Sequence, residues 1–139
     1  MSETASSTTA TADEVNLVAV NRYVEFWNAA TADEQRRLSA ETFAAGVSYH
    51  APLGLMRGAE EMVGFRNQFA QHVPGYRFQP RSKPDAHHDR ARLQWELVVG
   101  GDSFAAGTDV LELDDEGRIV SVASFLDQAP EGFDPHAHH

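Results

Sequence analysis

The chain has 139 residues, 42% of them hydrophobic, no cysteine and a formal net charge of −10. This length and composition predict one folded domain with a core of its own, and the lack of cysteine excludes disulfides, thiolate catalysis and cysteine-bound zinc. The negative charge repels phosphate backbones and anionic headgroups, so nucleic acid and membrane surfaces are not expected partners.

The two ends of the sequence have the composition of tails. Residues 1–12 are rich in Ser, Thr and Ala and lack the basic start and apolar stretch of a signal peptide, and residues 129–139 end in three histidines, a weak metal-binding signal. No apolar run approaches the ~20 residues of a membrane span. We therefore expect a disordered tail over 1–12, one domain over 13–128, a flexible tail over 129–139, and a cytoplasmic location.

Three helices are predicted in the first half of the chain. Apolar side chains recur at helical spacing over residues 13–29 and again over residues 59–72. A shorter helix is predicted over about residues 32–44, because Thr31 and Glu34 form a capping-box pattern at its start.

Five strands are predicted, over about residues 47–50, 76–86, 91–99, 103–113 and 118–127. Pro52 lacks a donor and should end the first strand's ladder, and Gly100-Gly101 should form a tight turn. The element order predicts an α+β fold: a cone-shaped domain whose strongly curved, mainly antiparallel sheet wraps around three helices and leaves an internal pocket.

Asp109 is the most informative residue for function. On a strand its side chain shares a face with Ala105, Gly107 and Leu111, and the opposite face is also largely apolar. Desolvation raises the pKa of such a carboxyl, and the protonated acid can donate a hydrogen bond to a ligand oxygen. The alternative is a structural carboxyl that caps a backbone group or pairs with an arginine.

Tyr23 and His50 are the other candidate catalytic residues. Tyr23 lies on the apolar stripe of the first helix, where a phenol needs a hydrogen-bond partner, and its alternative role is that of a core tyrosine. His50 ends the first strand; histidine is the residue type best suited to proton transfer near neutral pH, and the alternative role of His50 is structural. Tyr49 points to the other face of this strand, and the sequence does not fix which of the two faces the pocket.

Six large side chains are candidates either for a pocket wall or for ordinary core: Trp27, Met56, Phe65, Phe69, Trp95 and Phe125. Arg57 and Arg66 are candidate anchors for an anionic ligand group, or simply exposed arginines. The sequence has no Gly-rich phosphate loop, no His-x-x-x-His pair and no nucleophile elbow. We therefore expect no cofactor, no metal site and no covalent intermediate.

Three local strings carry a family resemblance: Arg-Tyr-Val-Glu-Phe at 22–26, Asp-Val-Leu at 109–111 and Asp-Glu-Gly-Arg-Ile at 115–119. With the element order over residues 14–128, they resemble the nuclear transport factor 2-like superfamily, especially its SnoaL-like polyketide cyclase and ketosteroid isomerase branches. The isomerases carry an oxyanion-hole tyrosine and a protonated aspartic acid in the matching segments. The resemblance implies that Tyr23 and Asp109 donate hydrogen bonds to one substrate oxygen.

One position departs from the isomerase pattern. The isomerases place their general base in an Asp-Pro pair after the first strand, and here the matching pair is Ala51-Pro52. Alanine cannot take a proton, so steroid isomerisation by that route is not expected. His50 is the substitute base if the strand bulges before Pro52.

Three functions remain open from the sequence. The first is a cofactor-independent isomerase or cyclase acting on an apolar carbonyl compound, in which Asp109 and Tyr23 stabilise an enolate-like oxygen and His50 moves the proton. The second is a non-catalytic binding protein for a small apolar molecule. The third is an interaction module with a vestigial pocket, since this superfamily commonly forms homodimers through the sheet. Epoxide opening needs paired carboxylates, for which Asp109 has only Glu96 or Asp127 as a partner.

Overall fold

The computed structural model describes residues 12–52 and 54–128. Its helices are α2 (Ala12–Trp27), α3 (Ala32–Thr42) and α4 (Ala59–His72). Its strands are β1 (Phe43–Ala51), β2 (Gly54–Arg57), β3 (Arg77–Pro80), β4 (Asp85–His87), β5 (Arg90–Val99), β6 (Asp102–Leu113) and β7 (Ile119–Gln128). The predicted tails lie outside the described residues, apart from Ala12, which begins α2.

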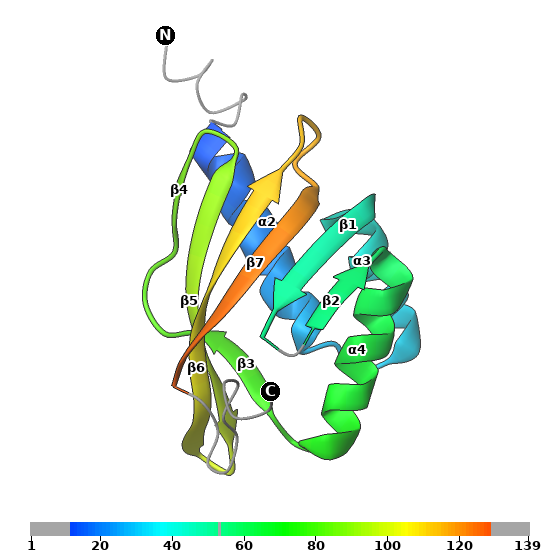
Figure 1. The fold of residues 1–139 in the computed structure, drawn as a ribbon, viewed down its shortest axis with the longest axis vertical. Helices are drawn as coiled ribbons and strands as arrows, with labels where there is room; N and C mark the ends of the chain where they lie inside the picture. The colour runs from blue at the N-terminus through cyan, green and yellow to red at the C-terminus, as the bar shows by residue number, and fades with distance from the viewer. Residues whose placement is uncertain (1–11, 53, 129–139) are drawn as a thin grey trace, which may run out of the picture.

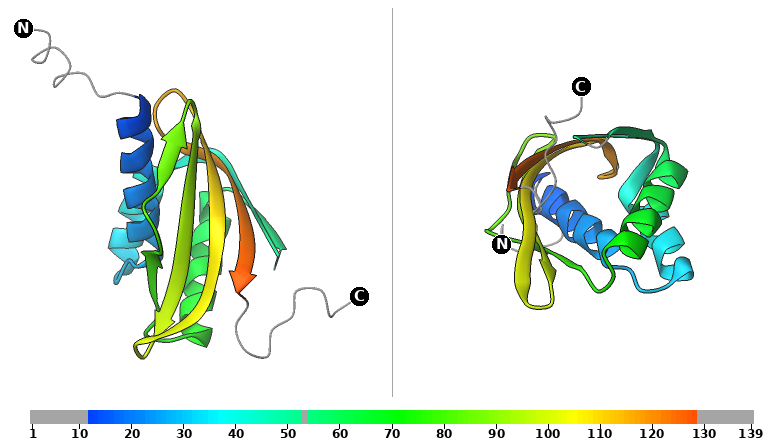
Figure 2. Two further views of the ribbon diagram at one scale, coloured as in Figure 1. Left: turned by 90° about the vertical axis from the view of Figure 1, so that its left-hand side faces the viewer. Right: turned by 60° about the horizontal axis from the view of Figure 1, so that its bottom comes forward.

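The strands form one sheet in the order β2-β1-β7-β6-β5-β3, with β4 also paired to β5. The β1–β7 pair is parallel and every other pair is antiparallel. The sheet bends around α2, with β5 and β6 on one side of this helix and α4 on the other (Figures 1 and 2). This arrangement confirms the predicted α+β, cone-like fold.

The predicted helix-start signal at Thr31 is confirmed. Thr31 Oγ1 accepts a hydrogen bond from the Glu34 N–H at 3.1 Å, and Glu34 Oε1 accepts one from the Ala30 N–H at 2.9 Å. These two bonds satisfy donors that a helix start otherwise leaves without partners. The helix is shorter than predicted, because the chain passes directly from Thr42 into β1.

One strand prediction is wrong. The predicted strand over 76–86 is two short strands, β3 and β4, which pair with different parts of β5. Pro80 and Pro84 border the break, and neither has an N–H to continue a ladder. Pro52 ends β1 as predicted, since the strand stops at Ala51, but the chain turns there and returns as β2, which was not predicted, so that Ala51 pairs with Gly54.

The predicted Gly100-Gly101 turn between β5 and β6 is confirmed. Both glycines have positive φ, 62° and 87°, as a two-residue hairpin of this kind requires. The next turn, between β6 and β7, is held by Asp114, whose Oδ1 accepts hydrogen bonds from the N–H groups of Glu116 and Arg118 at 2.9 and 3.0 Å. The three long strands β5, β6 and β7 therefore form an antiparallel meander.

The core lies between α2 and the concave face of the sheet. Tyr23 and Phe26 from α2 are fully buried, and both meet the ring of Phe43 edge to face, with centroids 6.2 and 5.0 Å apart. Tyr23 makes a similar contact with Phe78 on β3 at 6.0 Å. Aromatic pairs of this geometry stabilise a core by about 0.5–1.5 kcal/mol beyond the area they bury. They fix α2 against strands from both halves of the sheet.

Arg66 joins α4 to the end of α2 and is half-buried, so it is neither an exposed arginine nor free to anchor an anionic ligand. Its Nε donates to the Trp27 carbonyl at 3.2 Å, and its Nη2 donates to the Ala29 carbonyl. Tyr76 Oη also donates to the Trp27 carbonyl, and the guanidinium lies 5.9 Å from the centre of the Tyr76 ring. Carbonyls that a helix end leaves without partners are thereby satisfied. Arg57, in contrast, is exposed.

Within the described ranges, no helix has the length and apolar character needed to cross a membrane.

We expect the Arg66→Ala variant to lose about 1–3 kcal/mol of unfolding free energy, because partly buried carbonyls lose charged donors. Urea unfolding measures this loss. The matched control is Arg37→Ala, which removes an exposed guanidinium 3.9 Å from Glu41 and should change stability by less than about 0.5 kcal/mol. Equal effects of the two substitutions would contradict the role given to Arg66.

Candidate functional site

A cavity of about 580 Å³ lies between α4 and the concave face of the sheet. This volume is ordinary for a site that binds a small molecule. Four of the six predicted wall residues line it: Trp27, Phe65, Phe69 and Trp95. Most of the rest of the wall is also apolar, with Phe78, Leu97, Phe104, Ala105 and Leu126 among its members.

The burial of the lining residues distinguishes an inner end from a mouth. Pro52, Gln68 and His72 line the cavity and are exposed, so they mark the mouth. Tyr49 and Ser124 also line it but are only 6% and 8% exposed, so they mark the inner end. The inner end therefore carries hydroxyl groups on a wall that is otherwise aromatic and aliphatic.

Asp109 lies immediately behind this inner end. Its side chain is 1% exposed; Oδ2 accepts a hydrogen bond from Tyr23 Oη at 2.6 Å, and Oδ1 accepts one from Trp95 Nε1 at 2.7 Å. The carboxyl is dry and beside the phenol of α2, as the sequence predicts. Neither Asp109 nor Tyr23 lines the cavity, however. The two side chains bond to each other and do not point together at one site in the cavity.

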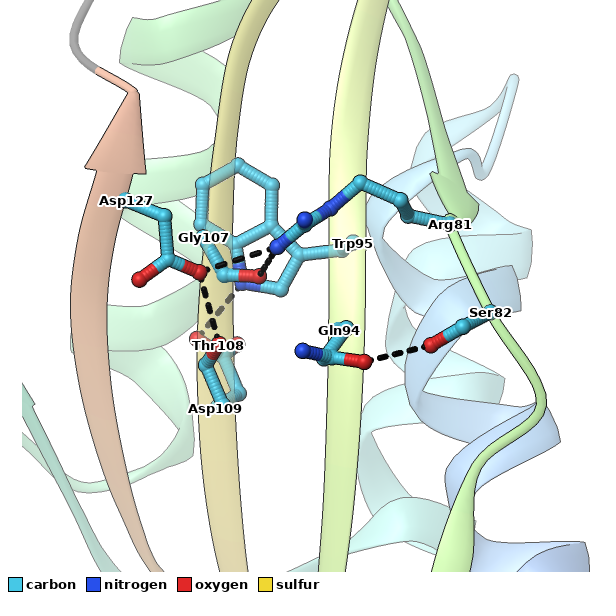
Figure 3. A network of polar contacts seen from close by, with 8 residues as sticks. All are labelled: Arg81, Ser82, Gln94, Trp95, Gly107, Thr108, Asp109 and Asp127. Carbon is cyan, nitrogen blue, oxygen red and sulfur yellow. Dashed lines mark hydrogen bonds and ion pairs between the residues drawn. The ribbon is translucent and has the colours of Figure 1, made fainter.

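Gly107 makes room for the indole that reaches Asp109. Trp95 on β5 pairs with Gly107 on β6, two residues from Asp109 on the same face (Figure 3). A Cβ atom at position 107 would overlap the Trp95 ring and the Phe125 carbonyl. A glycine is therefore required here for the close approach of the ring and not for an unusual φ. This contact was not predicted from the sequence.

Burial sets the protonation of the acid and of the phenols. Burial raises the pKa of Asp109 from 3.8 to about 6, although hydrogen bonds from Ser124, Tyr23 and Trp95 oppose the rise. Burial, followed by the charge of Asp109, raises the pKa of Tyr23 well above its usual value, and the same two causes raise the pKa of Tyr49. Both phenols therefore keep their protons, while Asp109 changes its charge near neutral pH.

His50 lies outside the cavity, contrary to the role predicted for it. The alternation of β1 turns Tyr49 inward and leaves His50 exposed, with Nε2 3.2 Å from Ser48 Oγ. The bulge in β1 lies before Ser48, so it does not turn His50 inward. The structure thus brings Tyr23 to Asp109 but does not bring His50 to either.

Two of the predicted wall residues also lie elsewhere. Phe125 is 58% exposed, because it sits on the convex face of β7 opposite Thr108. Met56 is half-buried on β2 and is not part of the cavity wall. Ser124, on the inner face of β7, was not predicted as a wall residue. Its signal in the sequence is a single hydroxyl between two apolar residues of the same face, Val122 and Leu126.

Among the residues that the structure describes, no second carboxylate accompanies Asp109. Asp127 lies on the convex face, where Oδ2 meets Arg81 Nη2 at 2.9 Å and Thr108 Oγ1 at 2.7 Å (Figure 3). Glu96 accepts a hydrogen bond from Gln79 at 3.0 Å, and its strand turns Trp95 and not Glu96 toward the core. The carboxylate pair that epoxide opening needs is therefore not assembled.

Among residues 12–52 and 54–128, no three His, Asp or Glu side chains gather closely enough to hold a metal ion. The terminal histidines that gave the weak metal signal lie outside these ranges.

The architecture and the cavity define a class of protein: an α+β domain whose curved sheet encloses a small-molecule pocket. Residues 20–122 match the SnoaL-like domain family. The chain therefore belongs to the SnoaL-like family. No curated protein matches it.

Solved structures agree with this assignment. A candidate isomerase of the SnoaL-like family from Agrobacterium tumefaciens C58 is 34% identical, with a TM-score of 0.77 over 81% of this chain and 97% of that one. A candidate SnoaL-like polyketide cyclase from Jannaschia sp. CCS1 is 17% identical, with a TM-score of 0.70 over 86% and 90%. A protein of unknown function with a cystatin-like fold, from Methylobium petroleophilum PM1, is 16% identical, with a TM-score of 0.69 over 90% and 84%.

We expect Asp109 to make the folded state less stable as the pH rises from about 4 to 7. Because the pKa is about 6 in the folded state and 3.8 ordinarily, the folded state binds the proton more tightly, and ionisation there costs about 3 kcal/mol. Below about pH 4 both states are protonated and the cost vanishes.

Urea unfolding of Asp109→Asn beside the native protein, at pH 4.5 and 7.5, isolates this contribution. The native protein should lose stability relative to the variant between the two pH values. Asp127→Asn, an exposed carboxylate, is the control and should follow the native protein. A constant difference between the native protein and Asp109→Asn would show that the carboxyl is not dry.

Proposed function

We propose that this protein binds a small apolar carbonyl compound in the cavity and acts on it as a cofactor-independent isomerase or cyclase. The observation that carries the proposal is the buried Asp109–Tyr23 hydrogen bond of 2.6 Å directly behind the inner end of an apolar cavity. An apolar wall removes water from the ligand, and electrostatic interactions gain strength in such surroundings.

The proposed chemistry needs no cofactor. In an isomerisation the proton taken from one carbon is returned to another carbon. In a ring closure the enolate carbon attacks a carbonyl carbon of the same compound, the C=O π bond breaks, and the resulting alkoxide oxygen takes the proton. The demand of either reaction on the protein is to stabilise an enolate-like oxygen, for which one well-placed donor contributes about 3–4 kcal/mol. In this proposal Tyr23 and Asp109 assist that role from behind the wall, since neither side chain lines the cavity.

Asp109 also takes the proton-moving role first given to His50, acting through its cross-strand partner Ser124, because Asp109 itself does not line the cavity. His50 is outside the cavity and Ala51 occupies the position of the isomerase base, whereas Asp109 is the carboxyl that lies directly behind the inner end among the described residues. A pKa of about 6 leaves much of it ionised at pH 7 and able to accept a proton.

A second candidate is a binding protein without turnover. It is favoured by one observation: among the described lining residues there is no carboxylate, and His72 lies at the mouth. An interaction module with a vestigial pocket, a homodimer formed through the sheet and a cytoplasmic location all stay predictions.

Exchange of α-protons in D₂O tests the proposed enolisation directly. We expect the native protein to accelerate deuterium uptake into a panel of apolar ketones such as 1-tetralone, followed by ¹H NMR. Asp109→Asn should lower the rate by about 10²–10³-fold, since it removes the acid–base group and disturbs the oxyanion contacts. The exposed His50→Ala and Asp127→Asn variants are matched controls and should keep the native rate.

Binding of the same ketones, measured in parallel, separates the two candidates. Ketones that bind without faster exchange would rule out the isomerase and leave the binding protein. A His50→Ala variant that lost the exchange rate would instead show that the histidine reaches the ligand, against the geometry above.

A further inference from the structure

Two hydroxyl groups form the polar part of the cavity's inner end. Ser124 comes from β7 and Tyr49 from the neighbouring strand β1, and both line the cavity. A serine side chain consists of one carbon and one hydroxyl group, so a serine whose side chain lines the cavity places its oxygen at the cavity surface. In the parallel pairing of β1 with β7, Tyr49 lies opposite Val122, two residues before Ser124 on the same face. The two side chains that carry the hydroxyl groups are therefore neighbours in the wall.

The other polar groups near the inner end are already engaged or enclosed. Tyr23 Oη and Trp95 Nε1 each donate to one oxygen of Asp109, at 2.6 and 2.7 Å. Trp27 Nε1 is fully enclosed and has no hydrogen-bond partner among the described residues. A ligand oxygen that reaches the inner end would therefore meet Tyr49 and Ser124 before any other polar side chain.

Ser124 connects this pair to the buried acid. Ser124 on β7 is the cross-strand partner of Asp109 on β6, and their side chains share the inner face of the sheet. Hydroxyl groups both donate and accept hydrogen bonds, so they can pass a change in the charge of Asp109 on to a ligand.

We propose that the hydroxyls of Tyr49 and Ser124 bind the oxygen of the ligand, and that Asp109 is a positioning residue acting through Ser124. The proposal rests on the proposed function, in which the cavity holds an apolar compound with one oxygen. It deepens that function by naming the side chains that touch the oxygen and by placing the oxygen at the inner end.

The aromatic wall indicates the shape of the ligand's apolar body. Trp27, Phe78 and Trp95 line the cavity in succession, with ring centroids 5.8 and 5.4 Å apart and ring planes inclined by only 35° and 34°. Rings in this arrangement present a nearly continuous face, which favours contact with a flat ring system. A flat bicyclic compound with one hydroxyl is therefore a suitable probe.

The experiment compares 2-naphthol with naphthalene, which has the same ring system and no oxygen. Ligand-observed NMR titrations give the affinity of both probes for the native protein, for Tyr49→Phe and for Ser124→Ala. We expect each substitution to weaken 2-naphthol about 3- to 10-fold, the range for one lost hydrogen bond, and to change naphthalene by less than twofold. Ser121→Ala removes a hydroxyl from the opposite face of the same strand and should change neither affinity.

The positioning role of Asp109 has its own readout. The affinity of the native protein for 2-naphthol should change between pH 5 and 7, while its affinity for naphthalene stays constant. In Asp109→Asn the pH dependence should vanish. If Asp109 acted only through packing, the Asp109→Asn substitution would change the affinities for 2-naphthol and naphthalene equally at every pH.

The outcomes separate the inference from the function on which it rests. If 2-naphthol binds Tyr49→Phe and Ser124→Ala as it binds the native protein, the polar contact is elsewhere and the inference is wrong, while the pocket function stands. Equal loss of both probes in a variant would also overturn it, since that residue would act by shape. If neither probe binds the native protein, the pocket function fails and the inference fails with it.

Discussion

The structure of this site depends on one carboxyl held away from water. Asp109 is buried on β6 and accepts one hydrogen bond from α2, through Tyr23, and one from β5, through Trp95. Breaking such a bond leaves a buried polar group unsatisfied, which costs about 1–3 kcal/mol, so the carboxyl holds the helix and two strands in a fixed relation. The same relation shapes the inner end of the cavity. Gly107 is part of this constraint, because only a residue without a side chain lets the indole pass.

The local parts of this arrangement were predictable and the long-range parts were not. Thr31 and Glu34 predict the start of a helix from the sequence alone, because a capping box is a short-range pattern. Asp109 stands out because a charge in a doubly apolar strand needs an explanation, and the structure gives it two hydrogen-bond donors, Tyr23 and Trp95. The contact between Trp95 and Asp109 depends on strand register. A two-residue turn at Gly100-Gly101 would place Trp95 opposite Ala106, but a bulge beside Leu97 moves it to Gly107.

The wrong predictions of wall residues also arise because strand register cannot be read from the sequence. Tyr49 and His50 are neighbours on one strand, so only one of them can face the cavity, and the pairing with β2 and β7 decides which. The strand β2 itself was not predicted, because a proline between two short segments gives no periodic signal. Phe125 is large and apolar but lies on the convex face. Its hydrophobicity alone does not indicate which face of the sheet it occupies.

Because Asp109 lies behind the cavity wall, the site consists of two layers with different roles. The inner layer holds a charge that varies near neutral pH, and the outer layer of hydroxyls and aromatic rings meets the ligand. The most direct test of this account is a ¹³C NMR titration of the Asp109 carboxyl, assigned with Asp109→Asn. The account predicts a midpoint near pH 6, with the Trp95 Nε1 proton shifting at the same midpoint. A midpoint near 4, or an indole signal that does not follow the titration, would contradict it.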